Sequence, residues 1–241
     1  MNLDLLGERS ARPLAVLRRG SATRRIRAWL AGLALALFLI GISLAPLTTP
    51  AFTRLLSRRT SQAQEAGLSP LRMAEVAEQV RGYVVDDDGR NLPAAVDGRP
   101  AFDDAAVSHL LDVRHVLEVV QILSGVLALA LVLGLVFEVA RKRTMLIAEA
   151  LAAGAAWSVA LVAGCIVVAL LDFDWFFSAF HRLFFDSGTW TFPGDSLLIL
   201  TFPEPFWVTA GAVWGGLILA GAGVFAVAAQ ALWRGNSKAL R

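Results

Sequence analysis

The sequence predicts an all-α integral membrane protein with four transmembrane helices. Hydrophobic residues make up 56% of the 241 residues, and charged residues make up 17%, below the roughly 25% usual in soluble domains. Mean hydropathy is +0.61. The apolar residues are gathered into four long runs, each close to the ~20 residues that a helix needs to cross a bilayer. This blocking, more than the overall composition, predicts the fold class.

The predicted transmembrane helices cover residues 28–46, 115–140, 146–171 and 206–233. In lipid each run must be helical, because every backbone N–H and C=O has to be bonded within the segment. The first run also resembles a signal peptide, since basic residues precede its apolar core. Its long basic leader, and the lack of a clear cleavage site before Pro46, favour a retained membrane anchor.

Lysine and arginine at the helix ends predict the orientation. They are concentrated in the leader (1–27), in the link between the second and third helices (141–145) and in the tail (234–241). These three segments lie on one side if all four runs span, and basic segments stay in the cytoplasm. Both termini are therefore predicted to be cytoplasmic, and segments 47–114 and 172–205 extracytoplasmic.

The two extracytoplasmic segments differ in character. Segment 47–114 is polar, and we expect a helix over residues 70–85 followed by a turn at 86–89, which makes it a partly helical domain. The apolar stripe expected on that helix consists of Leu71, Met73, Val76, Val80 and Tyr83. Segment 172–205 is rich in Phe and Trp, which is typical of the headgroup zone, so it is predicted to be a re-entrant or interfacial loop.

Three remaining observations limit the function classes. The formal net charge of +2 gives no electrostatic reason to expect nucleic acid as a partner. The single cysteine, Cys165, excludes an internal disulfide, and its apolar surroundings favour a packing role. Small residues around Gly211-x-x-x-Gly215 predict close helix packing within the protein, with dimerisation as the alternative.

The three histidines are His109, His115 and His181, and all are predicted on the outer side. His109 and Asp112 are three residues apart on one helix face, so the carboxylate is placed to orient the imidazole and support its charged form. His181 lies among aromatic residues, where desolvation favours a neutral base. Arg114 and Glu118, four residues apart, are expected to form a local ion pair. Chance placement of polar residues in loops is the simpler alternative.

Other catalytic patterns are weak. The sequence has no Gly-x-Ser-x-Gly elbow, no phosphate-binding glycine loop and no Cys-x-x-Cys motif. His109, His181 and Asp112 are possible metal ligands by type, but their spacing matches no metal motif. No metal and no cofactor is therefore predicted.

Two histidine-containing patterns resemble the bacterial lipoprotein intramolecular transacylase family. The first is His-Leu-x-Asp-Val-Arg, and the second begins Phe-His-x-x-Phe-Phe and continues to Pro-Glu-x-Phe. The residues that carry the resemblance are His109, Leu110, Asp112, Val113, Arg114, Phe180, His181, Phe184, Phe185, Trp190, Asp195, Leu197, Leu200, Pro203, Glu204 and Phe206. The likeness runs from the first to the fourth helix and leaves out the basic leader.

This resemblance implies an enzyme of the bacterial cell membrane whose active site faces the extracytoplasmic side. It would move the sn-2 acyl chain of an S-diacylglyceryl cysteine to the α-amino group of the same cysteine, giving a lyso-form lipoprotein. The implied partners are diacylated lipoproteins and membrane lipids. The implied catalytic residues are His109 and His181. The residues expected to support them or to position the substrate are Asp112, Arg114, Arg182, Trp190, Asp195 and Glu204.

We expect His181 to act as the base and His109 as the acid. A competing hypothesis is a non-enzymatic membrane protein, a sensor or assembly factor that binds through its first external segment. Histidines more than ~12 Å apart, too far to act on one reacting centre, would favour that hypothesis. A transporter is a third possibility, but the centres of the second and fourth helices lack the ionisable residues usual in transport paths.

Overall fold

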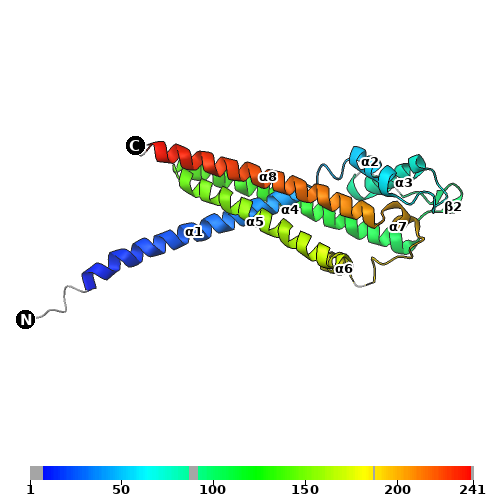
Figure 1. Cartoon of the computed structure of the whole chain (residues 1–241), viewed down its shortest axis with the longest axis horizontal. Coiled ribbons are helices and arrows are strands. Elements are labelled where there is room, and N and C mark those ends of the chain that lie inside the picture. The colour runs from blue at the N-terminus through cyan, green and yellow to red at the C-terminus, as the bar shows by residue number, and fades with distance from the viewer. Residues whose placement is uncertain (1–7, 87–91, 187, 240–241) are drawn as a thin grey trace, which may run out of the picture. The chain divides into compact units, whose positions relative to one another are not determined.

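A computed structural model describes residues 8–86, 92–186 and 188–239, with side chains from 22 to 237. In these residues the regular structure consists of eight helices and one two-stranded hairpin (Figure 1). The start of the leader, most of the predicted turn at 86–89 and the last two residues of the tail lie outside them. The chain divides into two compact units. The first unit takes the chain up to Leu39, Leu127–Ala160 and Leu219 onward, and the second takes Ile40–Val126 and Leu161–Ile218.

Four helices are long and apolar enough to cross a membrane in the part of the chain described. They are α1 (Glu8–Ile42), α4 (Asp104–Ala140), α5 (Thr144–Leu171) and α8 (Glu204–Ala239). Large apolar side chains such as Ile122 and Val227 are 65% and 69% exposed on them, as expected where lipid is the solvent. The prediction of an all-α membrane protein with four spans is confirmed.

Small residues and ion pairs hold the first unit together. A Cβ added to Gly32 on α1 would lie 2.6 Å from the Cβ of Ala153 on α5, so the two backbones meet where no larger residue fits. Arg24 on α1 also pairs with Glu149 on α5 at 3.0 Å. The close packing predicted for the small-residue face around Gly211-x-x-x-Gly215 is found at Gly221, where a Cβ would lie 2.5 Å from Leu39 Cδ1, but not at the motif itself. A Cβ at Gly211 meets nothing within 4 Å, and one at Gly215 would make only ordinary contact with Val162.

The outer part of the second unit begins with α2 (Pro50–Thr60) and α3 (Pro70–Val85), the latter at the predicted residues. Ser69 caps α3 by accepting a hydrogen bond from the Arg72 amide at 3.1 Å. Met73, Val76 and Val80 form its buried stripe. Leu71 is 59% exposed, so its assignment to the stripe is wrong. At ~100° per residue it lies on nearly the opposite face from Met73.

A short hairpin, β1 (Ala95–Val96) and β2 (Arg99–Pro100), follows α3. Its two-residue turn is Asp97-Gly98, with φ of 50° and 81°. Positive φ at both positions is what a type I′ turn requires, and Asp-Gly is a favoured pair for it.

The two segments predicted to be extracytoplasmic share one core. The short helix α7 (Leu197–Thr201) comes from the second segment and packs on α3 from the first. The Gln62 amide donates to the Leu200 carbonyl at 2.9 Å. Leu198 packs with Val80 of α3 and with Leu110 at the start of α4. This core therefore holds the beginning of α4 between residues from both segments.

A buried ion network fixes the end of α3. Arg81, 6% exposed, donates to Glu78 at 2.8 Å and to Asp86 at 2.6 Å. Hydrogen bonds to Asp86 and then to Glu78 raise the pKa of Arg81. Arg81 Nη1 donates to Asp86 Oδ1 at 2.9 Å and also reaches the Thr48 carbonyl at 3.4 Å. The network ties α3 to the chain that leaves α1.

Candidate active site

His109 lies near the start of α4 and is only 8% exposed. The Asp103 carboxylate accepts a hydrogen bond from the Ala106 amide at 2.8 Å and so begins the helix. The imidazole packs against Phe185 and Phe192, with ring centroids 4.9 and 5.5 Å away. Its Nδ1 is buried and has no hydrogen-bond partner. Nε2 is therefore the ring nitrogen left to meet a substrate.

His181 lies on α6 (Phe173–Phe184), a helix within segment 172–205. Asp172 caps α6 by accepting from the Trp175 amide at 2.9 Å. The imidazole packs on Phe177, with ring centroids 4.0 Å apart. Its Nδ1 lies 2.8 Å from the Phe177 carbonyl oxygen, so Nδ1–H donates there and Nε2 again remains available.

Burial lowers the pKa of His181, and the hydrogen bond to the Phe177 carbonyl opposes that shift. The expectation that aromatic surroundings favour a neutral His181 is confirmed. Since α6 is amphipathic, its aromatic face supplies these surroundings.

The two imidazoles face each other across a small gap, with ring centroids 6.2 Å apart and planes inclined by 29°. Phe185 contacts both rings. The rings that enclose the pair, here called the aromatic cage, are Phe177, Phe180, Phe185, Trp190 and Phe192. Residues 72 positions apart in the sequence thus form one site, within a single compact unit of the chain.

Trp190 adds an unused donor to the aromatic cage. Its ring centroid lies 4.8 Å from that of His181, and its Nε1 is buried without a hydrogen-bond partner. Buried polar groups are nearly always bonded, so an exception calls for an explanation. A bound substrate carbonyl would supply the missing acceptor.

Five other residues were predicted to support the site. Burial and then His181 lower the pKa of His109, and the charge of Asp112 opposes that shift. Asp112 is half-buried on α4 and makes no hydrogen bond to His109. Arg114 pairs with Glu118 at 2.9 Å, as predicted. The remaining members are exposed, and the described side chains show no hydrogen bond, ion pair or ring contact between them and either histidine; they are Arg182, Asp195 and Glu204.

Three features of the site were not predicted from the sequence. They are the Phe177 carbonyl as partner of His181, the contact of Phe192 with His109, and the unpartnered N–H of Trp190. The sequence did indicate the contact between the Phe177 carbonyl and His181, because Phe177 precedes His181 by four residues on one helix face. It did not indicate the Phe192 contact, since that depends on how the loop after α6 folds back. Within residues 8–86, 92–186 and 188–239, no group of three His, Cys, Asp or Glu is arranged to hold a metal ion.

Comparisons with known proteins agree with this layout. The family model of the lipoprotein intramolecular transacylase Lit matches residues 29–207. The solved structure of the membrane-integral lipoprotein intramolecular transacylase Lit from Bacillus cereus superposes with a TM-score of 0.76, at 16% identity, over 90% of this chain and 99% of that one. No curated protein gives a significant match.

Two further structures are variants of the same Bacillus cereus protein in which one histidine is replaced by arginine or by alanine. Their TM-scores are 0.67 and 0.66, both at 15% identity, over 94% and 92% of this chain and 99% of theirs. At this identity the structures show a shared fold, and the family model, which spans most of the chain, shows the family. The chain is a multi-pass membrane protein and belongs to the lipoprotein intramolecular transacylase family.

Proposed function

We propose that this protein moves the sn-2 acyl chain of an S-diacylglyceryl cysteine onto the α-amino group of the same cysteine, giving a lyso-form lipoprotein. The carrying observation is the pair of imidazoles, 6.2 Å apart, inside the aromatic cage. The substrates are diacylated lipoproteins of the bacterial cytoplasmic membrane, and the site faces the extracytoplasmic side. The reaction needs no cofactor, because nucleophile and ester belong to one substrate.

The surroundings of the two histidines favour complementary tautomers. His181 donates Nδ1–H to the Phe177 carbonyl, so its Nε2 carries a lone pair and suits a base. A proton on Nδ1 of His109 would be buried without an acceptor, which is costly. His109 therefore keeps its proton on Nε2 and suits an acid. Both nitrogens that do chemistry are the Nε2 atoms.

The proposed reaction begins at the α-amino group of the substrate. The α-ammonium group first loses one proton to the medium, and the amine attacks the ester carbonyl while His181 Nε2 takes the second proton. The C–N bond forms, the C–O bond to the sn-2 oxygen breaks, and His109 Nε2–H protonates that oxygen. The proton on His181 passes to His109, directly or through one water, as His109 gives up its own, so no free imidazolate forms and both rings end neutral.

Trp190 is placed to stabilise the tetrahedral intermediate. Its buried N–H has no protein acceptor and lies on the indole that packs against His181. A fixed donor aimed at developing negative charge costs no reorganisation during the reaction. We assign it the ester oxygen that becomes the oxyanion.

The aromatic cage supplies the second requirement, which is a folded substrate. Because amine and ester share one molecule, the protein has only to hold them in a reactive conformer. Phe180 and Phe184, 44% and 42% exposed on α6, offer apolar surface for an acyl chain. The polar groups of Asp112 and Arg114, and the exposed Arg182, Asp195 and Glu204, are proposed to meet the glycerol and peptide parts of the lipoprotein.

The non-enzymatic alternative does not require the histidines to meet. It would be favoured by a separation above ~12 Å, and the rings lie at about half that distance. The geometry therefore favours the transacylase over a sensor or assembly factor.

The test is expression in a bacterium that makes diacylglyceryl lipoproteins but does not N-acylate them. Tandem mass spectrometry of a lipoprotein's N-terminal peptide then locates each acyl group, because intact mass is unchanged by an intramolecular transfer. We expect N-acyl fragments with the unchanged protein and none with His109→Ala or His181→Ala.

The matched control is His115→Ala, since His115 is exposed on the same helix as His109 and outside the aromatic cage. It should retain full activity. Full activity in either cage variant, with membrane levels matched by immunoblot, would rule out the two-histidine mechanism. A free amine with the unchanged protein would rule out the transacylase itself for the substrates tested.

A further inference from the structure

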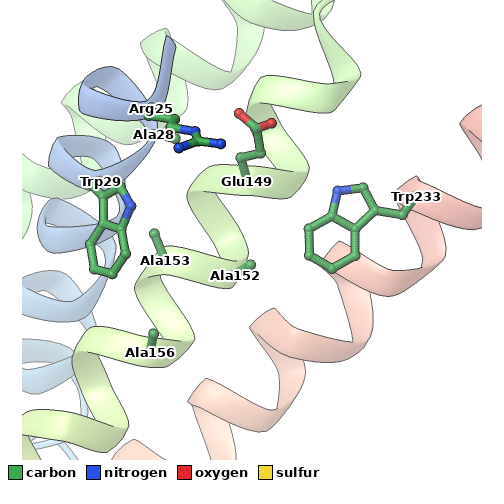
Figure 2. A pocket seen from close by; sticks show the side chains of 8 residues that line it. All are labelled: Arg25, Ala28, Trp29, Glu149, Ala152, Ala153, Ala156 and Trp233. Carbon is green, nitrogen blue, oxygen red and sulfur yellow. The ribbon is translucent and has the colours of Figure 1, made fainter. Parts of the chain in front are cut away.

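The first unit contains a pocket of about 390 Å³ that plays no part in the chemistry proposed above. Figure 2 shows it bordered by α1, α5 and α8. The lining residues are Arg25, Ala28, Trp29, Glu149, Ala152, Ala153, Ala156 and Trp233. Its size is within the ~300–1,000 Å³ usual for small-ligand sites.

One end of the pocket carries a guanidinium without a partner among the described residues and a carboxylate with one unpartnered oxygen. In Figure 2 the Arg25 guanidinium points toward the Glu149 carboxylate. Glu149 Oε1 is taken by Arg24 at 3.0 Å, but Oε2 is buried and has no hydrogen-bond partner. Arg25 has no ion pair or hydrogen bond within the described residues. A ligand with a hydrogen-bond donor and an anionic group would complete both.

The rest of the pocket is apolar. Two tryptophans, which are amphipathic, flank it. Ala152 and Ala156 on α5 form a smooth wall between the indoles of Trp29 and Trp233 (Figure 2). These indoles are 51% and 39% exposed. Tryptophan prefers the headgroup level of a membrane, so the charged end corresponds to a headgroup and the alanine wall to the first methylenes of an acyl chain.

We propose that this pocket binds phosphatidylethanolamine. The ammonium group of that lipid donates to Glu149 Oε2, and its phosphate pairs with Arg25. Both charges lie on one headgroup a few bonds apart, and both protein groups lie at one end of one pocket. The basic residues at this end of the helices predict the cytoplasmic leaflet. The bound lipid is thus a structural ligand and not the acyl donor, and the proposal does not depend on the transacylase activity.

Two other phospholipids separate this proposal from general lipid binding. Phosphatidylcholine has the same phosphate, but its trimethylammonium group has no N–H to donate to Glu149. Phosphatidylglycerol has the phosphate and hydroxyl donors but no positive charge. A hydrogen bond to a charged group changes affinity by about tenfold or more, so the three should differ measurably.

The experiment is native mass spectrometry of the full chain, delipidated in detergent and titrated with each lipid carrying identical acyl chains. We expect phosphatidylethanolamine to bind about tenfold tighter than phosphatidylcholine and tighter than phosphatidylglycerol. Glu149→Gln should make the affinities for phosphatidylethanolamine and phosphatidylcholine equal. Arg25→Gln should weaken every lipid, because the phosphate is common to all.

Ala156→Phe is the variant that fills the pocket without changing charge, and it should lower occupancy by all three lipids. Glu149 also pairs with Arg24, so Glu149→Gln could fail to fold. In that case Ala156→Phe still tests the proposal. Arg54→Gln, an exposed arginine on α2, is the control and should bind as the unchanged chain does. Equal binding of phosphatidylethanolamine and phosphatidylcholine, a preference for phosphatidylglycerol, or unchanged binding in Ala156→Phe and Arg25→Gln would each overturn the proposal.

Discussion

His181 keeps its Nδ1 against the Phe177 carbonyl, 2.8 Å away, while His109 buries its own Nδ1 against apolar neighbours. The same side chain therefore presents a lone pair at one position and an N–H at the other. Neither requires an ionised ring, because the carbonyl and the apolar surroundings select the tautomer. This division of labour is the physical basis for assigning base and acid.

The pKa of His181 predicts the shape of the pH profile. The substrate amine, with a pKa of about 8, must lose a proton, so log kcat/KM should rise with slope 1 on going from pH 6.5 to pH 7.5. Burial lowers the pKa of His181 below the ordinary 6.5, so its imidazole stays neutral through that range. The slope should steepen to 2 only below pH 6.5. Initial rates on a peptide with an S-diacylglyceryl cysteine check this. A slope that steepens at or above pH 6.5 would contradict it.

Trp190→Phe removes one N–H and keeps an aromatic ring in the cage. If that N–H stabilises the oxyanion, kcat should fall by about 10²-fold with little change in KM. Trp207→Phe is the control, because its Nε1 donates to the Phe202 carbonyl at 2.9 Å and serves packing. Similar small losses in both variants would show that Trp190 acts through packing alone.

The predicted topology placed all three histidines on one membrane face, and the family resemblance selected His109 and His181 among them. Neither indicated how each imidazole is held. Asp112 was expected to orient His109 and support its charged form. It makes no hydrogen bond to Nδ1, and burial lowers the pKa of His109 against the opposing charge of Asp112, because helix spacing fixes a shared face but neither rotamer nor burial. Phe192 was unpredictable for a different reason, since a loop contact has no periodicity.

At the scale of elements, local sequence signals predicted a helix correctly where they were used. Pro70–Val85 has a Ser cap, a proline in its first turn and a periodic apolar face, and it is helical over those residues. The Asp97-Gly98 turn also carried a strong local signal for its hairpin, though the strands on either side have only two residues each. By contrast, the docking of α7 on α3 joins residues 128 apart through contacts such as Thr201 with Met73, and no local pattern encodes it.

Helix packing in the first unit gives a test at this scale. Gly32→Ala places a Cβ 2.6 Å from Ala153 Cβ and 2.8 Å from the Gly154 amide nitrogen, so a helix backbone must shift. We expect a loss of about 1–3 kcal/mol in unfolding free energy. Gly211→Ala is the matched control, since its Cβ meets nothing within 4 Å, and should be neutral or slightly stabilising. Reversible unfolding in detergent compares the two, and equal stability would show that α1 and α5 do not approach closely.

At the scale of the whole molecule, the proposed active site lies in one compact unit, to which segments 47–114 and 172–205 both contribute. His109 precedes the apolar part of α4, His181 lies on α6, and the core of α3 and α7 holds the start of α4. Fold class followed from hydropathy alone. The shared core did not, because membrane topology places two loops on one side without saying that they pack.

That predicted topology can be checked with single cysteines. After Cys165→Ala, a cysteine at Asp97 should react with a membrane-impermeant maleimide in intact cells, because Asp97 lies in the predicted extracytoplasmic hairpin. A cysteine at Ser237, in the predicted cytoplasmic tail, should react only after the membrane is opened. The reverse pattern would place the histidine pair on the cytoplasmic side.

The complementary tautomers also mean that the same two histidines could catalyse the reverse reaction. Run backwards, the Nε2 proton of His109 would return to His181, and His109 would take the proton of the glycerol hydroxyl while His181 gave one to the departing amine. Nothing in such a pair distinguishes substrate from product. The thermodynamic preference for an amide, whose C–N bond gains resonance, over an ester would then set the direction of transfer. A lyso-form product incubated with the protein should therefore keep its acyl group on the nitrogen, and tandem mass spectrometry should find no return of that group to the sn-2 oxygen of the same molecule.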